Sequence, residues 1–359
     1  MLTDEFISYI SSVRRYSPRT QSIYSDILKE FSAFAGGRCG AGGDVPDQCR
    51  IPVDGSLEHA ADDRTLTEAL TPTVLRDYEF HLAEDRHLGA KSINQQMSAL
   101  SSFCRWMVRS GRLKSNPLAI VKRPRVEKRL PAFYRERSMS EYFQDTEYAA
   151  SREALDDFLP VAARLGDSPR SSSAYKFAED LYYRRLRRLI ISILYSTGVR
   201  RAELIGLNVG SVDFSRGVMT VRGKGDKMRE IPVTSSLSEE ISLYLEAAES
   251  AAGRSRTSGE PLLTTVRGNR LYPMFVERAV RSELGMVDDI TGRKSPHVLR
   301  HTLATELLND GADIYSIKEL LGHSSLAATQ VYTHNTVEKL KKVYINAHPR
   351  AKRGGKDGD

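Results

Sequence analysis

One stretch of the chain alternates apolar and polar residues with a period of two, whereas most of the rest follows helical periodicity. This stretch, GVMTVRGKGDKMREIPVT (217–234), contains two short alternating runs around Gly-Lys-Gly-Asp, which is the pattern of a β-hairpin. Apolar residues recur with helical spacing through most of the first 130 residues, and the chain after the hairpin is helical to its end. The sequence therefore predicts a mainly α fold with one small β-hairpin or sheet.

A basic segment with several prolines, residues 116–131, interrupts the helical pattern. A chain of 359 residues suits two domains better than one. We therefore predict an N-terminal helical domain over residues 1–115, a basic linker over 116–131 and a second domain over 132–335.

Two further segments differ from these domains. Residues 36–65 contain six glycines and two prolines with little periodicity, which predicts a flexible insertion in the first domain. Residues 336–359 begin with an apolar helical stripe from Val337 to Tyr344. This stripe is too short to form a core of its own, so the tail is expected to dock on another surface, and folding back on its own domain is the simplest case.

The charge distribution indicates a surface for an anionic partner. The chain has a net charge of +7, and nine Lys or Arg residues but one acidic residue lie between Arg105 and Arg129. Such a run is either a solvated face or a surface for a phosphate backbone.

In the first domain, the polar face of the helix around residues 89–107 carries amides, which can read adenine edges. The candidate DNA-binding residues are Lys91, Asn94, Gln95, Lys122, Arg123 and Arg125.

Composition also bears on the compartment. No stretch approaches the ~20 consecutive apolar residues of a membrane span, and the N-terminus lacks the basic-then-apolar order of a signal peptide. The three cysteines, Cys39, Cys49 and Cys104, cannot all pair, which favours free thiols in a reducing, cytoplasmic environment.

Residues 295–334, SPHVLRHTLATELLNDGADIYSIKELLGHSSLAATQVYTH, contain four of the eight histidines of the chain. His297 and His301 are four residues apart, a helical spacing that suits zinc. Val298 follows His297, however, so the HExxH motif with its general base is absent. Arg300 would also place a fixed positive charge beside the metal. This cluster therefore favours an anion site over a zinc hydrolase.

The start of this segment and a second segment around Arg200 supply anion-binding groups. Ser295-Pro296 predicts a helix start, which places Arg300 and His297 on one face of its first turns, where backbone N–H groups favour anions. Arg200 follows the helix-ending Gly198 and has Glu203 three residues on, in reach of its guanidinium group.

Together, the motifs TGVRRAEL, GKGDK, SPHVLRHT, LLGHSSLAATQVYTH and AHPRA resemble those of the tyrosine recombinases, specifically the Xer-type recombinases that resolve chromosome dimers. The resemblance covers the C-terminal half of the chain. The ending HPRAKRG is similar to the tail of the XerC branch. The resemblance implies the tyrosine recombinase fold, with a SAM-like core-binding domain before the catalytic domain. Glu203 matches the acidic residue that supports the first arginine, and Glu306 stands where many Xer proteins have a histidine. The implied catalytic residues are Arg200, Lys224, His297, Arg300, His323 and Tyr332.

The resemblance implies DNA cleavage by Tyr332 through a 3′-phosphotyrosine, with two arginines holding the phosphate. His297 would help to remove the tyrosine proton, and Lys224 would protonate the departing 5′-oxygen. His323 would bond the phosphate or brace the nucleophile. The ester conserves the bond energy, so neither ATP nor a metal or other cofactor is implied.

The implied partners are a double-stranded recombination site and a ring of four protomers, formed with itself or with a paralogous recombinase. A DNA translocase is a further candidate as activator. Two alternatives remain open: an integrase of a mobile element, and a sequence-specific DNA-binding protein with an inactive site.

Overall fold

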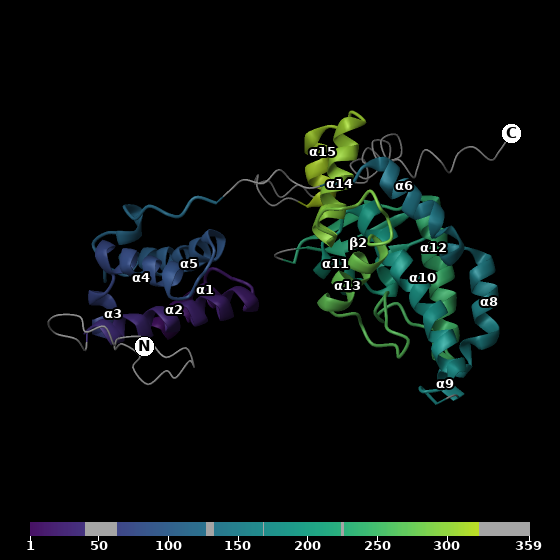
Figure 1. The fold of residues 1–359 in the computed structure, drawn as a ribbon, viewed down its shortest axis with the longest axis horizontal. Coiled ribbons are helices and arrows are strands. Elements are labelled where there is room, and N and C mark those ends of the chain that lie inside the picture. Colours follow the sequence, from purple (N-terminus) through teal and green to yellow (C-terminus); the bar gives the residue numbers. More distant parts are fainter. Residues whose placement is uncertain (40–62, 127–132, 168, 224–225, 323–359) are drawn as a thin grey trace. The chain divides into compact units, whose positions relative to one another are not determined.

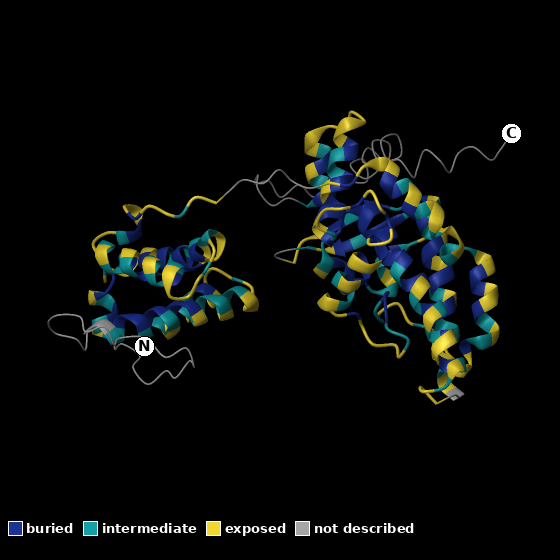
Figure 2. Ribbon diagram, in the orientation of Figure 1, coloured by how far each residue is buried: buried dark blue, intermediate teal, exposed yellow. Residues whose placement is uncertain are grey.

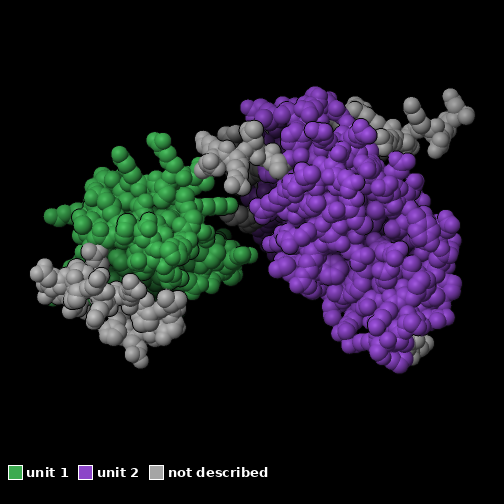
Figure 3. All heavy atoms as spheres, in the orientation of Figure 1, with its two compact units in different colours: residues 1–129 green, residues 130–359 purple. Residues whose placement is uncertain are grey.

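The computed structural model describes residues 1–39, 63–126, 133–167, 169–223 and 226–322. The chain divides into two compact units, Met1–Arg129 and Leu130–Asp359, which are coloured green and purple in Figure 3. Among the described residues, no helix is both long and apolar enough to cross a membrane.

Unit 1 is a group of helices around one apolar core. Its elements are α1 (Leu2–Ser12), α2 (Pro18–Cys39), α3 (Asp63–Glu68), α4 (Pro72–Glu84), α5 (Ala90–Arg109) and the short 3-10 helix η1 (Pro117–Ala119). Helix α4 begins at Pro72 because Thr71 caps it, its hydroxyl accepting the N–H of Val74. The expected apolar face of α5, which includes Met97 and Phe103, is buried in the core.

Unit 1 differs in detail from the sequence expectations. The insertion was expected to begin at residue 36 and to end at residue 65, but α2 continues to Cys39 and α3 already begins at Asp63. The glycines in the last turn of α2 are tolerated because Phe34 and Ala35 pack in the core beside them. The rest of the insertion, 40–62, lies outside the described residues and includes Cys49.

The first part of the predicted linker lies against unit 1. Asn116 caps η1, its side chain accepting the N–H of Leu118. Leu118 and Val121 are both buried in the unit 1 core. Cys104 is a free thiol in the same core, and burial raises the pKa of this thiol to about 12.

Unit 2 is built around one long buried helix, α10, and carries a small sheet. Figure 2 shows the dark blue of buried residues running along α10. The helices of this unit are α6 (Glu136–Asp145), α7 (Glu147–Ala150), α8 (Arg152–Ala162), α9 (Arg164–Asp167), α10 (Ser173–Thr197), α11 (Arg201–Gly206), η2 (Val209–Ser211), α12 (Ser235–Ala252), α13 (Pro273–Glu283), α14 (Pro296–Asn309) and α15 (Ile314–Leu321) (Figure 1).

The sheet has three antiparallel strands in the order β1-β2-β3: β1 (Val212–Asp213), β2 (Val218–Arg222) and β3 (Met228–Pro232). Strands β2 and β3 form the predicted hairpin, in which Thr220 pairs with Glu230. The two-residue strand β1 was not predicted, because two residues are too few to show an alternating pattern.

Helix α10 ends where the sequence predicts. Gly198 has a φ of 61°, the left-handed conformation in which glycine is favoured. A β carbon at Gly198 would lie 2.6 Å from Cδ2 of Leu321 and 3.0 Å from Cδ2 of Leu303. A glycine is therefore required twice over here, by its backbone conformation and by the close approach of α14 and α15.

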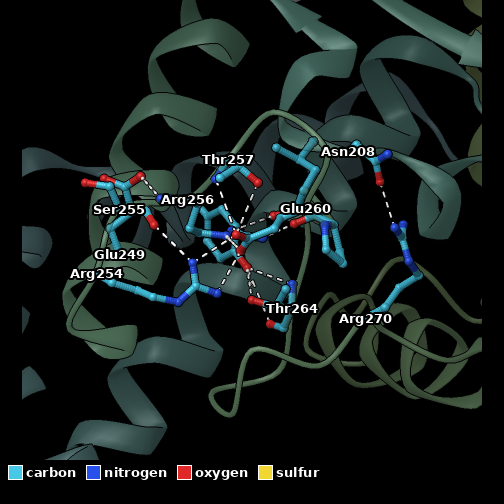
Figure 4. Close-up of polar contacts among 12 residues, drawn as sticks. Asn208, Glu249, Arg254, Ser255, Arg256, Thr257, Glu260, Thr264 and Arg270 are labelled. Atoms are coloured by element: carbon cyan, nitrogen blue, oxygen red, sulfur yellow. Dashed lines mark hydrogen bonds and ion pairs between the residues drawn. The ribbon is translucent and has the colours of Figure 1, made fainter.

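Arginines fix the long connection between α12 and α13 (Figure 4). Arg270 donates to the carbonyl oxygens of Ile205 (2.7 Å) and Leu207 (3.1 Å) and to Asn208 Oδ1 (2.7 Å). Arg254 holds Glu260 through two hydrogen bonds of 2.9 and 3.0 Å. The connection thus anchors the end of α11, the helix that begins beside Arg200.

Candidate active site

Arg200 and Glu203 form a capping pair at the start of α11. Arg200 is the N-cap residue, and its backbone N–H donates to Glu203 Oε2 at 2.8 Å. Its guanidinium Nη1 donates to Glu203 Oε1 at 2.7 Å. Glu203 is buried, whereas the side chain of Arg200 is 35% exposed. Glu203 therefore fixes both the backbone and the side chain of an arginine that solvent can still reach.

A second arginine, Arg229 on β3, holds the other side of Glu203. Its Nη1 and Nη2 donate to the two carboxylate oxygens at 3.0 and 2.8 Å. Burial by itself would raise the pKa of Glu203, but the hydrogen bonds from Arg229 and Arg200 outweigh it and lower that pKa. Glu203 is consequently a carboxylate at neutral pH.

Three arginines bind three successive carbonyl groups at the end of α15. Nε of Arg229 donates to the carbonyl of Leu320 at 3.1 Å, and Nη2 of Arg200 donates to that of Gly322 at 2.8 Å. Arg300 donates to the carbonyl between them, that of Leu321. The C-terminal end of a helix carries partial negative charge, so cations are favoured there.

Arg300 is buried and also donates to the carbonyl of Gly198. Burial and the neighbouring Arg200 lower the pKa of Arg300 to about 10, so it remains charged at neutral pH. Arg200, Arg229 and Arg300 contribute three positive charges and Glu203 one negative charge, which leaves a formal charge of +2. This cluster favours an anion such as a phosphodiester.

Lys224, His323 and Tyr332 lie outside the described residues. The residues directly before the first two are described, and both lie at the arginine cluster. Gly322 accepts the hydrogen bond from Arg200. A β carbon at Gly223 would lie 3.5 Å from Arg229 Nη1 and 3.7 Å from Glu203 Oε1.

His297 is exposed in the first turn of α14, on the helix that also carries Arg300. Partial burial and the nearby Arg201 lower the pKa of His297, so its imidazole is neutral at pH 7 and can accept a proton. In the described part of the chain, no group of three or more His, Cys, Asp or Glu side chains could hold a metal ion.

The candidate DNA-binding residues of unit 1 occupy α5 and the segment after it. Lys91, Gln95, Lys122 and Arg125 are exposed. Arg123 is exposed and donates to Ser98 Oγ on α5 at 2.8 Å. Asn94 donates its Nδ2 to the carbonyl of Pro124 at 2.9 Å. This amide thus holds the basic segment against α5, a role that its position on the helix did not suggest.

Arg229 is the residue of the cluster that the sequence reasoning missed. It lies on the buried side of β3 together with Ile231, two residues further on. In an amphipathic strand, residues two apart share a face, so a charged residue in register with a buried isoleucine was the available signal. A charged residue is rarely buried without a partner, and this one has Glu203.

Glu306 on α14 is a buried carboxyl group that accepts a hydrogen bond from the Tyr195 hydroxyl at 2.9 Å. Burial, which outweighs the hydrogen bond from Tyr195, and the nearby Glu136 and Asp310 together raise its pKa from 4.5 to about 7. Because the pKa of Glu306 is raised in the folded state, its protonated form contributes fully to stability below pH 4.5. This contribution is lost as the pH rises through about 7.

We therefore expect Glu306→Gln, which stays uncharged, to be more stable than the wild type at pH 8 but not at pH 4.5. Because one pKa unit corresponds to about 1.4 kcal/mol, the difference at pH 8 should be about 3 kcal/mol. Urea unfolding of both proteins at several pH values measures it. The exposed Glu239→Gln is the matched control, and a gap that stays constant with pH would contradict the expectation.

Comparisons with known proteins place this chain in a family. Residues 172–339 match the phage integrase family, and residues 2–111 match the N-terminal SAM-like domain of phage integrases. The tyrosine recombinase XerC of Chlorobaculum parvum is 33% identical over 353 residues, which are 97% of this chain and 94% of the relative. The tyrosine recombinase XerC of Bacillus pumilus is 32% identical over 351 residues, 96% of this chain and 95% of the relative.

Solved structures share the fold. The transposon Tn1549 integrase in complex with transposon right-end DNA has a TM-score of 0.57 at 15% identity, covering 95% of this chain and 97% of that one. A lambda integrase tetramer bound to a Holliday junction has a TM-score of 0.52 at 17% identity, covering 92% and 80%. The predicted fold class, mainly α with a small sheet, is confirmed. The chain belongs to the tyrosine recombinases of the phage integrase family, which are site-specific DNA recombinases.

Proposed function

We propose that the chain cleaves and rejoins a DNA recombination site through Tyr332 and acts in the resolution of chromosome dimers in the cytoplasm. The observation that supports this most is the arginine cluster at the end of α15. Arg200 and Arg300 bind the carbonyl groups of Gly322 and Leu321, directly before the segment that runs from His323 to Tyr332. The two arginines that would hold the phosphate thus contact backbone that lies only about ten residues before Tyr332, the residue that would attack it.

The reaction is a transesterification. The Tyr332 oxygen forms a bond to the scissile phosphorus while the bond from phosphorus to the 5′-oxygen breaks. Arg200 and Arg300 neutralise the charge of the non-bridging oxygens. The tyrosine proton passes toward the neutral imidazole of His297, and Lys224 gives a proton to the 5′-oxygen. His323 donates a hydrogen bond to the phosphate or braces Tyr332. Attack by a 5′-hydroxyl from the other duplex reverses the step and exchanges strands.

The proposed assembly is a ring of four protomers on two DNA sites, formed by this chain alone or with a paralogous recombinase. Residues 336–359 would then dock on a neighbouring protomer, and a DNA translocase would activate the ring. The XerC relatives from Chlorobaculum parvum and Bacillus pumilus cover nearly the whole chain, which favours this role over that of a mobile-element integrase.

Incubation with chromosomal terminus DNA that carries suicide nicks tests the proposal. Loss of a short fragment past the nick prevents religation, so a covalent protein–DNA band should accumulate, and sequencing of its junction locates the site. An adduct formed only on attachment-site DNA of a mobile element would favour the integrase alternative. Specific binding without any adduct would favour the inactive DNA-binding protein.

We expect Lys224→Ala to cleave ordinary DNA poorly and to regain cleavage on DNA with sulfur at the 5′-bridging position. Sulfur leaves without protonation, so the general acid is dispensable on that substrate. Rates of adduct formation on both substrates measure the effect. Lys227→Ala, which removes an exposed lysine of the same hairpin, is the control. Equal impairment of Lys224→Ala on both substrates would exclude the general-acid role.

We expect joint replacement of Lys122, Arg123 and Arg125 by glutamine to weaken binding to any DNA sequence. Each side chain that no longer neutralises a phosphate should reduce the log–log salt dependence of binding by about 0.9. Titrations at several salt concentrations measure this slope.

The matched control removes three exposed charges from the α9 end of unit 2, by replacing Arg164, Arg170 and Lys176 with glutamine. In Figure 1, α9 lies at the opposite end of unit 2 from α14 and α15. This control should leave the slope unchanged. If both triple variants have the wild-type slope, residues 122–125 are an ordinary solvated surface.

A further inference from the structure

All three guanidinium nitrogens of Arg229 are bonded within the protein. Its side chain is 5% exposed, and its hydrogen bonds all point into the protein: two to Glu203 and one to the carbonyl of Leu320. It does not belong to the six residues proposed for the chemistry. It nevertheless contacts the group that holds Arg200.

We propose that Arg229 is a positioning residue for recombination, which neutralises Glu203 so that this carboxylate orients Arg200 without cancelling its charge. The proposal rests on the proposed function, because it assumes that Arg200 binds the scissile phosphate. It adds a residue that acts on the reaction through Glu203 and Arg200.

The charges within the cluster support this role. Glu203 receives both terminal nitrogens of Arg229, so these two buried groups form a neutral, bidentate pair. Glu203 has room for two further hydrogen bonds, and Arg200 donates both, one from its backbone and one from its side chain. Without Arg229, the full negative charge of Glu203 would act on Arg200 alone. The guanidinium group would then be less able to attract a phosphate.

The close approach of two glycines to Arg229 supports the same role. A β carbon at Gly223 would lie 3.5 Å from Nη1 of Arg229, and one at Gly322 would lie 3.2 Å from the same atom. The guanidinium of Arg229 therefore packs against the residue before Lys224 and the residue before His323. Gly322 also has a φ of 65°, which favours glycine. One buried side chain thus contacts two backbone segments that lead to proposed catalytic residues.

The test compares two substrates for the same variants. One carries an ordinary scissile phosphate in suicide DNA, and the other carries a methylphosphonate there, in which an uncharged methyl group replaces a charged oxygen. If Arg229 maintains the positive charge offered by Arg200, its loss should matter for the charged phosphate and much less for the uncharged phosphonate. A residue that only stabilises the fold would affect both substrates equally.

We expect Arg229→Met to slow adduct formation about 10- to 100-fold on phosphate DNA, below the roughly 100- to 1,000-fold typical for a group that touches the transition state. On methylphosphonate DNA the loss should shrink to a few-fold. Adding Glu203→Gln to Arg229→Met should recover part of the activity on phosphate DNA, because the amide oxygen still accepts a hydrogen bond from Arg200 and brings no unbalanced charge.

Arg185→Met is the matched control, because Arg185 is equally buried in unit 2 but binds the carbonyl groups of Ala150 and Ser151. Its loss should lower the melting temperature and affect both substrates alike. If Arg229→Met does not fold, Arg229→Lys replaces it in the same comparison. Its compact ammonium group cannot reproduce the forked contact to Glu203 and the bond to the Leu320 carbonyl together, so a smaller loss, again larger on phosphate DNA, is expected.

Equal losses on the two substrates, or wild-type rates on phosphate DNA, would overturn the positioning role of Arg229. Either result is distinct from failure of the proposed function, in which the wild-type chain itself would form no adduct on any recombination site.

Discussion

We expect Tyr332→Phe to abolish the covalent protein–DNA adduct and to leave DNA binding at the wild-type level. The substitution removes the attacking oxygen and keeps the aromatic ring, so the contacts that hold DNA remain while the ester cannot form. Denaturing gels of suicide DNA reactions measure the adduct, and gel shifts on the same DNA measure binding. The loss should be complete within the sensitivity of the gel.

Tyr315→Phe is the matched control for this expectation. Tyr315 is an exposed tyrosine on α15, seventeen positions before Tyr332 in the sequence. Its hydroxyl is not required by the proposed chemistry, so adduct formation should stay normal. An SDS-resistant complex formed by Tyr332→Phe would show that another tyrosine is the nucleophile.

Local sequence patterns predicted those parts of unit 2 that depend on local interactions. Gly198 was expected to end a helix in the left-handed conformation, and it does. Ser295 and Pro296 were expected to start a helix, and α14 begins at Pro296 with Ser295 as its N-cap. The hairpin of β2 and β3 likewise has the predicted residues. Caps and tight turns require particular residue types within a few positions, so they can be recognised from sequence.

The contacts that organise the site could not be predicted in this way. The sequence placed Glu203 within reach of Arg200, three residues away, but Arg229 reaches the same carboxylate from β3, 26 residues along the chain. The carbonyl groups at the end of α15 gave no signal at all, because every residue has a carbonyl group. Only the packing of α15 beside α14 and β3 brings these oxygens to the arginines.

The same packing predicts that lysine does not substitute for arginine at position 300. We expect Arg300→Lys to slow adduct formation about 100- to 1,000-fold, the usual cost of losing a group that stabilises transition-state charge. The guanidinium of Arg300 donates to the carbonyl groups of Gly198 and Leu321 from separate nitrogens. A lysine keeps the charge but has one ammonium group, which cannot reach both carbonyl groups and a phosphate together. Single-turnover rates on suicide DNA measure the loss.

Arg300→Lys should also leave the carbonyl group of Gly198 or Leu321 without a donor, which has a second, independent effect on stability. A buried acceptor without its donor costs about 1–3 kcal/mol, so Arg300→Lys should also unfold at a lower urea concentration than the wild type. Arg216→Lys is the control, because Arg216 is a more exposed arginine that pairs with Glu230 on the sheet. It should change neither stability nor rate appreciably, as expected for an exposed ion pair.

If Arg300→Lys cleaves within about threefold of the wild type, the phosphate is held by other groups. If cleavage is lost but stability is unchanged, Arg300 contributes through its charge geometry alone, and the carbonyl contacts do not hold α14 against α15.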